Sequence, residues 1–489
     1  MLFQPVNKIQ PIDKKFFIEK INIINEMVQK YCMEENINFV NIEINRNTAI
    51  TELIKFGIIE SKEDLEFLKK TITKEYEPLL KSLTLYLKNN LHFLNKFSNA
   101  YRKKLQLKNE KSDKPKIIDL FCGAGGFSSG FLKEGYKVEL ANDIEKVALE
   151  TYKFNHPEIS TSKIIEVDIK QIVENINDFI NTDIDIIIGG PPCQSFSSAN
   201  QQRIIDDPRN ILYKYYVKAV EKIKPKFILM ENVRGMKKVA NQVVEDFNKI
   251  GYDVEYDLFN SSDFSVAQKR IRLLYIGINR EYALKNKITP NMLMEDVFKE
   301  LDKKPKFVLK DAIEHMKPLG CAKVKNLTEI DCEDSGKKIS INKYPLNKYL
   351  KLINDNKISE FVFNHKARFN NPNDQEIYSI LEQGKDATCK SISHIMPYSH
   401  RNHVFKDKYF KLIENNPSRT ITAHMKMDCH SHIHPTQIRG LTPREAARIQ
   451  SFPDDYLFLG PYLKTYMQIG NAVPPLMSRV FAKVYKKYI

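Results

Sequence analysis

The sequence predicts an α/β protein built on a Rossmann-like, doubly wound and mostly parallel sheet, with a helical extension before it and a smaller mixed α/β region after it. Three observations carry this prediction. Short apolar runs alternate with helical patterns between residues 116 and 277. A glycine-rich turn joins the first run to a helix. The apolar run at 184–188 is typical of a strand buried on both faces, and it stops at a Gly-Gly-Pro-Pro bend.

Composition narrows the class of protein. The chain has 489 residues and is 42% hydrophobic, enough for two to four domains with sizeable cores. Its net charge of +15 favours nucleic acid as a partner, although a general richness in Lys, Ile and Asn also contributes to that charge. Seven scattered cysteines indicate reduced thiols and a cytoplasmic protein. We find no apolar run of membrane-spanning length and no signal peptide, so no membrane partner is expected.

Residues 1–112 are predicted to be a helical extension. The sequence SKED at 61–64 resembles a capping box, and Pro78 should break or kink the helical pattern around it. Two apolar stripes have helical spacing: Ile12, Phe16, Phe17, Ile21 and Ile24, then Leu79, Leu83, Leu87, Leu91 and Leu94. Such stripes usually form plain core, and no chemistry is visible in this region. The charged stretch at 108–116 is interpreted as a linker.

The first strand-turn-helix unit comes next. A strand is expected at 116–121, a glycine turn at 122–126 and a helix from 127 to 132. A second strand at 137–141 leads to Asp143, and a third at 164–167 leads to Asp168. An acidic residue about 20 positions after a glycine turn can accept ribose hydroxyl groups, so Asp143 is a candidate ligand-binding residue.

Cys193 follows the strand at 184–188 directly after the Gly-Gly-Pro-Pro bend. Ligands of open α/β sheets sit outside the carboxyl ends of the strands, where a thiol held by a rigid bend is available for chemistry. The alternative is a buried cysteine without a role, which is how most free cysteines are used. A fifth strand at 227–230 brings Glu231 to the same sheet edge.

Two polar stretches complete this region. Residues 194–210 are predicted to be a polar loop, suited to a lid over a substrate, and a helix is expected at 211–223. Gln268, Arg270 and Arg272 alternate within an otherwise apolar run, so we expect them to share one face of a strand and to point into a site.

These motifs, in their order, resemble the bacterial DNA (cytosine-5) methyltransferase family of restriction-modification systems. The resemblance extends from residue 116 to the C-terminus and leaves residues 1–112 outside. Its landmarks are DLFCGAGGF at 119–127, GGPPCQSFS at 189–197, ENV at 231–233, QKRIR at 268–272, RGLTPREAARIQSFPDDY at 439–456 and GNAVPP at 470–475.

The resemblance implies an S-adenosylmethionine-dependent methyltransferase fold and a covalent mechanism on cytosine. Cys193 would be the nucleophile, Glu231 the acid at N3, and Arg270 and Arg272 would hold the base, its phosphate or Glu231. Residues implied to bind S-adenosylmethionine are Phe121, Gly123, Gly125, Gly126, Asp143, Asp168 and Asn471. Residues implied to contact duplex DNA around a flipped-out base are Gln194, Ser195, Arg203 and Gln268.

The expected domains are a helical extension at 1–112, a catalytic domain at 113–280, a target-recognition domain at 281–425 and a return to the catalytic domain at 426–489. His430, His432 and His434 alternate after Cys429, but no complementary Cys/His pair lies nearby, so no metal is expected. A monomer is expected, and a restriction endonuclease acting on the same DNA site is the implied functional partner.

Other functions remain open from the sequence. A DNA-binding protein that has lost catalysis would not need Cys193, Glu231 and Arg270. One branch of the family methylates tRNA, but the long variable region between Arg272 and Arg439 favours duplex DNA. A nicotinamide dehydrogenase is suggested by 119–126 alone, and the later motifs argue against it.

Overall fold

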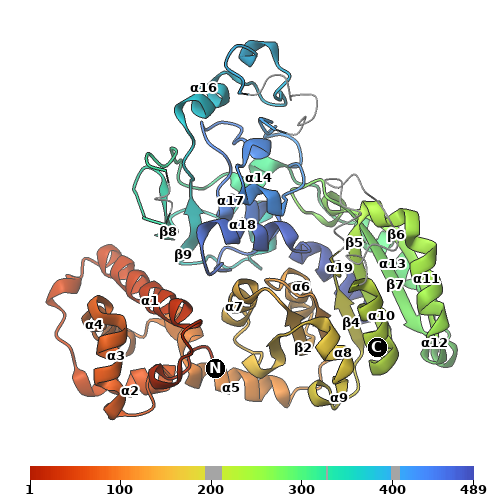
Figure 1. Ribbon diagram of the computed structural model, residues 1–489, viewed down its shortest axis with the longest axis horizontal. Coiled ribbons are helices and arrows are strands. Elements are labelled where there is room, and N and C mark those ends of the chain that lie inside the picture. The colour runs from red at the N-terminus through yellow and green to blue at the C-terminus, as the bar shows by residue number, and fades with distance from the viewer. Residues whose placement is uncertain (193–211, 326–328, 398–407) are drawn as a thin grey trace.

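The computed structural model describes residues 1–192, 212–325, 329–397 and 408–489 (Figure 1). A seven-stranded sheet in the order β3-β2-β1-β4-β5-β7-β6 forms its centre. The five neighbouring strands β3, β2, β1, β4 and β5 are parallel, whereas β7 runs antiparallel between β5 and β6. The predicted doubly wound, mostly parallel fold is therefore confirmed. The strands are β1 (Lys116–Leu120), β2 (Lys137–Asp143), β3 (Ile164–Glu166), β4 (Ile186–Gly189), β5 (Phe227–Val233), β6 (Tyr252–Asn260) and β7 (Ile271–Asn279).

Alternation along the strands gives the sheet two buried faces. Ile117, Ile186 and Ile188 belong to one apolar cluster, and Ile118 and Ile187 belong to another. Helices cover both faces, as a mostly parallel sheet requires. The first cluster lies against α6 (Gly126–Lys133), α13 (Pro290–Leu301) and α19 (Pro475–Tyr485), and the second against α8 (Ile169–Glu174), α10 (Leu212–Ile223) and α11 (Ala240–Lys249). Helices α7 (Lys146–Asn155), α9 (Ile176–Phe179) and α12 (Arg280–Asn286) complete this part.

The order of the strands reverses between β1 and β4, which are direct neighbours in the sheet. At such a switch point the connections leave in opposite directions, and a crevice opens outside the carboxyl ends of the two strands. Ligands of open α/β sheets bind there, so a ligand site is expected at this edge of the sheet.

Residues 1–110 form the helical extension, which we call the N-terminal domain. Its helices are α1 (Lys14–Glu34), α2 (Arg46–Phe56), α3 (Leu65–Ile72), α4 (Tyr76–Lys88) and α5 (Asn99–Glu110). The capping box at Ser61 and Asp64 is present, and Pro78 lies in the first turn of α4, after the break that follows α3. Two stripe assignments were wrong: Ile12 precedes α1 and is 61% exposed, and Leu87 is 55% exposed near the end of α4.

A smaller domain lies above the sheet in Figure 1. It contains the antiparallel pair β8 (Gly336–Ile341) and β9 (Phe361–Lys366) with α14 (Leu309–Ile313), α15 (Lys348–Ile353) and α16 (Pro372–Ile380). Helix α17 (Pro443–Ile449) packs on β9 and α14, and α18 (Tyr462–Asn471) and α19 return the chain to the sheet. Helix α13 packs against β6 and β7, and helix α12 packs against β7.

None of the helices that the structure describes combines the length and apolar character that a membrane span requires.

Candidate active site

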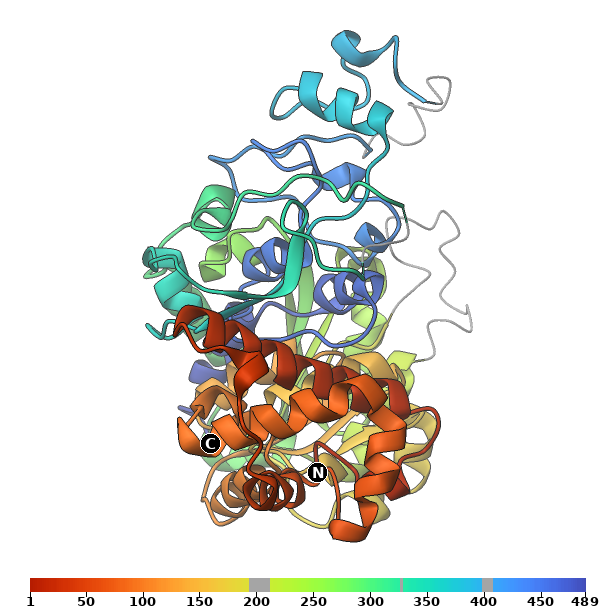
Figure 2. The ribbon, with the colours of Figure 1, turned by 90° about the vertical axis from the view of Figure 1, so that its left-hand side faces the viewer.

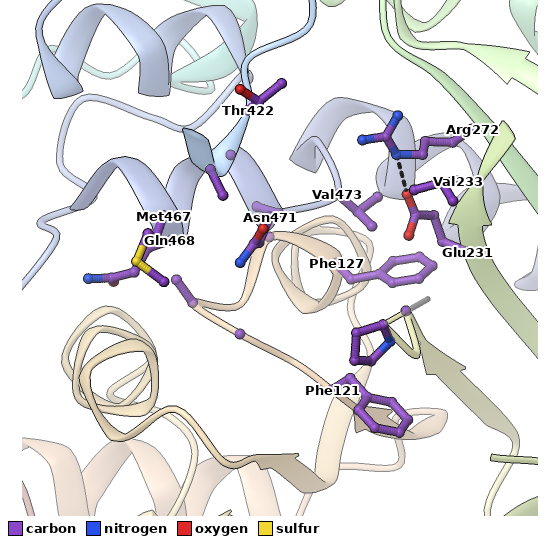
Figure 3. A pocket seen from close by; sticks show the side chains of 18 of the residues that line it. Phe121, Phe127, Glu231, Val233, Arg272, Thr422, Met467, Gln468, Asn471 and Val473 are labelled. Atoms are coloured by element: carbon purple, nitrogen blue, oxygen red, sulfur yellow. Dashed lines mark ion pairs between the residues drawn. The ribbon is translucent and has the colours of Figure 1, made fainter. Parts of the chain in front are cut away.

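A cavity of about 1100 Å³ opens at the carboxyl ends of β1, β4 and β5, at the switch point of the sheet (Figure 3). Its floor comes from the turn after β1 and from Gly190, Pro191 and Pro192 after β4. Helix α18 and the segment from Pro417 to His424 close the opposite side. Segments separated by several hundred residues therefore meet at one edge of the sheet, as the strand order requires.

Phe121, the first residue after β1, has an unusual backbone conformation. Its φ is +59°, in the left-handed region that large side chains rarely adopt. The strain turns the chain sharply from the strand into the glycine turn, and Phe121 lies in the wall of the cavity (Figure 3). Strain of this kind is kept where the surrounding structure and the function require it, which supports a ligand-contacting role for the ring.

The acidic side of the cavity is organised by backbone amides. The Asp143 carboxylate accepts hydrogen bonds from the amides of Gly123 and Glu145, each at 2.8 Å. Burial raises the pKa of Asp143 above its usual range, and these hydrogen bonds oppose that shift. Asp168 caps α8 by accepting from the Lys170 amide at 2.8 Å and also lines the cavity. Both acids stand where a ligand with hydroxyl and amino groups could reach them.

Gly125 is not among the residues that line the cavity, and the structure gives a packing reason for glycine at this position. Its φ is +86°, and an added Cβ would lie 2.8 Å from the Tyr152 ring and 3.0 Å from the His156 imidazole. Glycine is needed here because α7 packs closely under the turn. Gly123, Gly126 and Asn471 do line the cavity.

Glu231 and Arg272 form the charged centre of the cavity. The Arg272 Nε lies 2.8 Å from the Glu231 Oε1, and the two side chains are only 16% and 12% exposed (Figure 3). Burial lowers the pKa of Arg272, and the Glu231 carboxylate opposes this shift. The base, its phosphate and Glu231 were the partners expected for the two arginines, and Arg272 contacts Glu231.

Arg270 plays a different part from Arg272. It is almost fully buried and donates from Nη1 to the carbonyl oxygens of Ile421 at 3.0 Å and Gly470 at 3.1 Å. Burial, and secondarily the charge of Arg272, lowers the pKa of Arg270. Arg270 therefore ties the end of α18 and the segment around Ile421 to the edge of the sheet, while remaining part of the cavity wall.

Gln268 is fully buried, and both ends of its amide are used inside the protein. It donates to Gln450 at 2.7 Å and accepts from the Ile421 amide at 2.6 Å. We therefore correct its assignment as a DNA-contacting residue. The expectation that residues 268, 270 and 272 share a strand face was also wrong, because β7 begins only at Ile271 and Gln268 forms an isolated bridge with Ser418.

Four expected site residues, Cys193, Gln194, Ser195 and Arg203, lie outside the described residues. The described chain leads up to them at Pro192. Pro191 is fixed from the neighbouring strand, because Asn232 donates to its carbonyl oxygen at 3.1 Å. A Cβ on Gly190 would lie 3.1 Å from the Glu231 Oε2, so the bend and the carboxylate are in close contact.

Several cavity residues were missed by sequence reasoning. Glu145 and Lys464 form an ion pair at 3.1 Å across the cavity wall. Gln468 lines the same wall, and its Oε1 is buried with no hydrogen-bond partner among the described residues. Only the folded chain brings α18 to the N-terminus of α7, so no local signal marked these positions.

The three alternating histidines are used within the protein. The His430 ring lies 4.4 Å from the Tyr409 ring and bonds to the Tyr378 hydroxyl at 2.7 Å. His432 bonds to the Thr420 carbonyl oxygen at 3.1 Å, and His434 receives the Gln437 amide at 3.1 Å. Within the described ranges, no group of three or more His, Cys, Asp or Glu residues has the arrangement of a metal site.

The cavity fits S-adenosylmethionine by the chemistry of its lining. A flat aromatic ring, three carboxylates and an unpaired amide oxygen can receive an adenine, ribose hydroxyls, a sulfonium and an ammonium group. The residues that offer these groups are Phe121, Asp143, Glu145, Asp168 and Gln468.

Comparison with known proteins agrees with this chemistry. Residues 115–487 match the family model described as C-5 cytosine-specific DNA methylase. The chain is 33% identical over 391 residues to the Type II methyltransferase M.DdeI of Desulfomicrobium norvegicum, covering 75% of this chain and 87% of the relative. It is 30% identical over 427 residues to the Type II methyltransferase M.AgeI of Thalassovita gelatinovora, covering 76% and 99%. A crystal structure from an E. coli prophage, assigned as a DNA modification methyltransferase, shares the fold with a TM-score of 0.58 and 24% identity, covering 76% of this chain and 99% of that one.

Proposed function

Because the chain belongs to the family of C-5 cytosine-specific DNA methylases, we propose that its cavity brings together a methyl donor and a flipped-out cytosine, with Cys193 as the nucleophile. The enzyme is a sequence-specific DNA (cytosine-5) methyltransferase that uses S-adenosylmethionine. The observation that carries the proposal is the buried Glu231–Arg272 pair beside the Gly190 bend. This pair lines the same cavity as the acids proposed to bind the donor, Asp143 and Asp168.

The proposed roles follow from the chemistry of cytosine. Carbon C5 is a poor nucleophile until a thiolate adds to C6, so Cys193 has to act as the thiolate. Glu231 is proposed to protonate or hydrogen-bond N3 as the ring receives the electron pair of the new S–C6 bond. Arg272 holds that carboxylate in one orientation by a charge-assisted hydrogen bond. Carbon C5 would then bond to the methyl group as the bond from that group to the donor sulfur breaks, and S-adenosylhomocysteine would leave. Loss of the C5 proton returns the electron pair that re-forms the C5–C6 double bond, the S–C6 bond breaks and the thiolate is regenerated.

The donor-binding residues are proposed as follows. Phe121 stacks on the adenine, Asp143 accepts the ribose hydroxyls and Asp168 receives the adenine amino group. Gly123, Gly126 and Asn471 border the end that carries the methyl group, which S-adenosylmethionine supplies as an electrophile when bound. All six residues line one cavity, which supports this assignment.

The biological role is proposed from the relatives. Relatives named Type II methyltransferases support a modification enzyme that protects host DNA, with a restriction endonuclease cutting the same unmodified sequence. We place the enzyme in the bacterial cytoplasm as a monomer. The target base is hidden in the duplex and has to be swung out, with Gln194, Ser195 and Arg203 as proposed DNA contacts.

Methyl transfer tests the function directly. With tritiated S-adenosylmethionine we expect label in duplex DNA, and bisulfite sequencing of DNA from expressing cells should report methylcytosine at one recurring sequence. Label in tRNA and none in DNA would assign the enzyme to a different substrate. DNA binding without any transfer would indicate a protein that has lost catalysis.

A further inference from the structure

The N-terminal domain lies outside the matched family region, yet it shares one apolar core with the rest of the protein. That core joins its helices to Phe154 of α7, to Ile339 and Phe361 of the β8–β9 pair, and to Leu457 and Leu459. The domain lies beside the sheet, with α1 next to β8 (Figures 1 and 2). A module tethered by a linker would have a core of its own, so the shared core indicates that this domain is packed onto the enzyme as one unit with it.

The point where these parts meet is a short segment at 457–460, which we call the hub segment. Asn155 of α7 bonds to both backbone groups of Leu457, at 3.0 and 2.8 Å, and Thr151 accepts from the Leu459 amide at 2.9 Å. Asn364 of β9 bonds to both backbone groups of Phe458, each at 3.0 Å. The hub segment is thus held by the catalytic domain and by the smaller domain at once.

The hub segment also touches the wall of the cavity. Gln468 of α18 donates to the Leu459 carbonyl oxygen at 2.9 Å, and Gln468 lines the cavity. At Gly460 the φ is +90°, and an added Cβ would lie 2.5 Å from Val147 of α7, another cavity residue. A shift of the hub segment would therefore move two walls of the donor pocket.

One carboxylate of the N-terminal domain, that of Glu19, also binds the hub segment. Glu19 of α1 accepts the Gly460 amide with both oxygens, at 2.9 and 3.1 Å, and pairs with Lys338 of β8. Its side chain is 18% exposed. Hydrogen bonds to a shielded charged group are stronger than neutral ones, so Glu19 fixes the Gly460 amide firmly.

Further charges of the same domain hold α7 along its length. Asp13 pairs with Lys146 at the start of the helix, at 2.6 Å, and Lys20 pairs with Glu150 in the middle, at 2.7 Å. At the end, the buried Arg102 donates to the carbonyl oxygens of Lys153 and Phe154. Cationic groups at a helix C-terminus satisfy carbonyl oxygens that have no partner within the helix.

We propose that the N-terminal domain is a positioning domain for the methyl-donor pocket, and that Glu19 is its principal positioning residue. Glu19 fixes the hub segment through the Gly460 amide, and the hub segment fixes Val147 and Gln468 in the cavity wall. The domain therefore acts on donor affinity, and not on the chemistry at the cytosine. This inference rests on the donor pocket of the proposed function.

The test is the affinity of the full-length protein for S-adenosylhomocysteine, measured by calorimetry without DNA. Glu19→Ala removes the bond to Gly460, and the dissociation constant should rise about tenfold, as expected for the loss of one charged hydrogen bond. Glu19→Gln keeps an acceptor oxygen for the Gly460 amide and should stay within about threefold of the wild type. Glu19→Asp shortens the side chain and should fall between them, and it serves as the comparison if the alanine variant does not fold.

Two control variants separate positioning from general stability. Glu52→Ala removes a buried carboxylate that pairs with Lys55 inside α2, so it should lower the melting temperature and leave the affinity unchanged. Lys338→Met removes the β8 partner of Glu19 and leaves the bonds from Glu19 to the Gly460 amide in place, so it should also leave the affinity unchanged. In steady-state assays of Glu19→Ala, the KM for S-adenosylmethionine should rise while kcat and the KM for DNA stay at wild-type values.

Equal affinities in all variants would overturn the proposal, as would a loss of affinity in Glu52→Ala or Lys338→Met matching that of Glu19→Ala. A rise in the KM for DNA equal to that for the donor would also overturn it. Because donor-analogue binding needs no DNA, an error in the assigned nucleic-acid substrate would leave this result unchanged.

Discussion

The Nε atom of Arg272 lies 2.8 Å from the Oε1 atom of Glu231, and the two residues come from the adjacent antiparallel strands β5 and β7. Both side chains are largely shielded from water. The pair fixes the orientation of a carboxylate beside the Gly190 bend, and this geometry is rigid because both residues belong to the sheet.

Arg272→Met should lower kcat by about two orders of magnitude, because an acid held out of its productive orientation contributes little to proton transfer. Donor affinity should change much less, because Arg272 contacts Glu231 and not the residues that are proposed to bind the donor. Single-turnover methyl transfer with saturating donor measures the effect. Arg280→Met is the matched control: it breaks the pair with Asp253 at the far end of β7, which is 46% and 45% exposed, and activity should be unaffected.

Phe121→Leu should weaken binding of S-adenosylhomocysteine by about two- to tenfold, since an aromatic stacking partner contributes roughly 0.5–1.5 kcal/mol beyond its buried area. Phe121→Gly should weaken binding as well, but it relieves the left-handed backbone at φ +59°, which costs about 1–2 kcal/mol for a residue with a side chain. Calorimetry gives the affinities. Unchanged affinity in both variants would remove Phe121 from the donor site.

Glu26 makes stability depend on pH. Burial, and then the neighbouring Asp331, raise the pKa of Glu26 from its ordinary 4.5 to about 7, while Lys30 and Lys338 act in the opposite direction. The folded protein therefore binds more protons than the unfolded chain between these two pH values, and the free energy of unfolding falls as the pH rises through that window. Glu26→Gln should raise the melting temperature at pH ~8 and change it little at pH ~4. An equal shift at both pH values would contradict this.

Gln268→Ala should lower the free energy of unfolding by about 2–3 kcal/mol, because it leaves the Ile421 amide and the Gln450 side chain without their partner in a buried site. The folded fraction should bind target DNA with wild-type affinity. Chemical denaturation and a gel-shift titration check the two halves. A specific loss of DNA affinity at unchanged stability would restore the original DNA-contact assignment.

Much of the sheet could be predicted, because strands buried on both faces leave a clear apolar pattern. Even so, Glu231 lies inside β5, since the strand continues to Val233 beyond its apolar part. Asp143 was predicted from its spacing after the glycine turn, and Phe121 was named through the family resemblance. These are local signals, and the structure places them where the pattern indicated.

The rest depends on contacts that spacing cannot show. Gln268 looks like a site residue because it alternates with two arginines, yet its amide turns to a partner 182 positions away. Gly125 looks like a ligand-contacting glycine, yet it makes room for α7. Lys464 and Gln468 carry no motif that links them to Glu145 or to the hub segment. In the N-terminal domain the sequence showed only apolar stripes. The residues that those helices pack against are distant in the sequence, so the proposed role of this domain could not be predicted.

The central claim is that the sulfur of Cys193 bonds transiently to C6 of the target cytosine. A duplex carrying 5-fluorocytosine at the methylated position blocks the release step, because fluorine cannot leave C5 as a proton does. With S-adenosylmethionine present, we expect a protein–DNA adduct that survives denaturation, maps by mass spectrometry to residue 193 and is absent in Cys193→Ser. If methyl transfer is active on normal DNA and no such adduct forms, the covalent account is wrong.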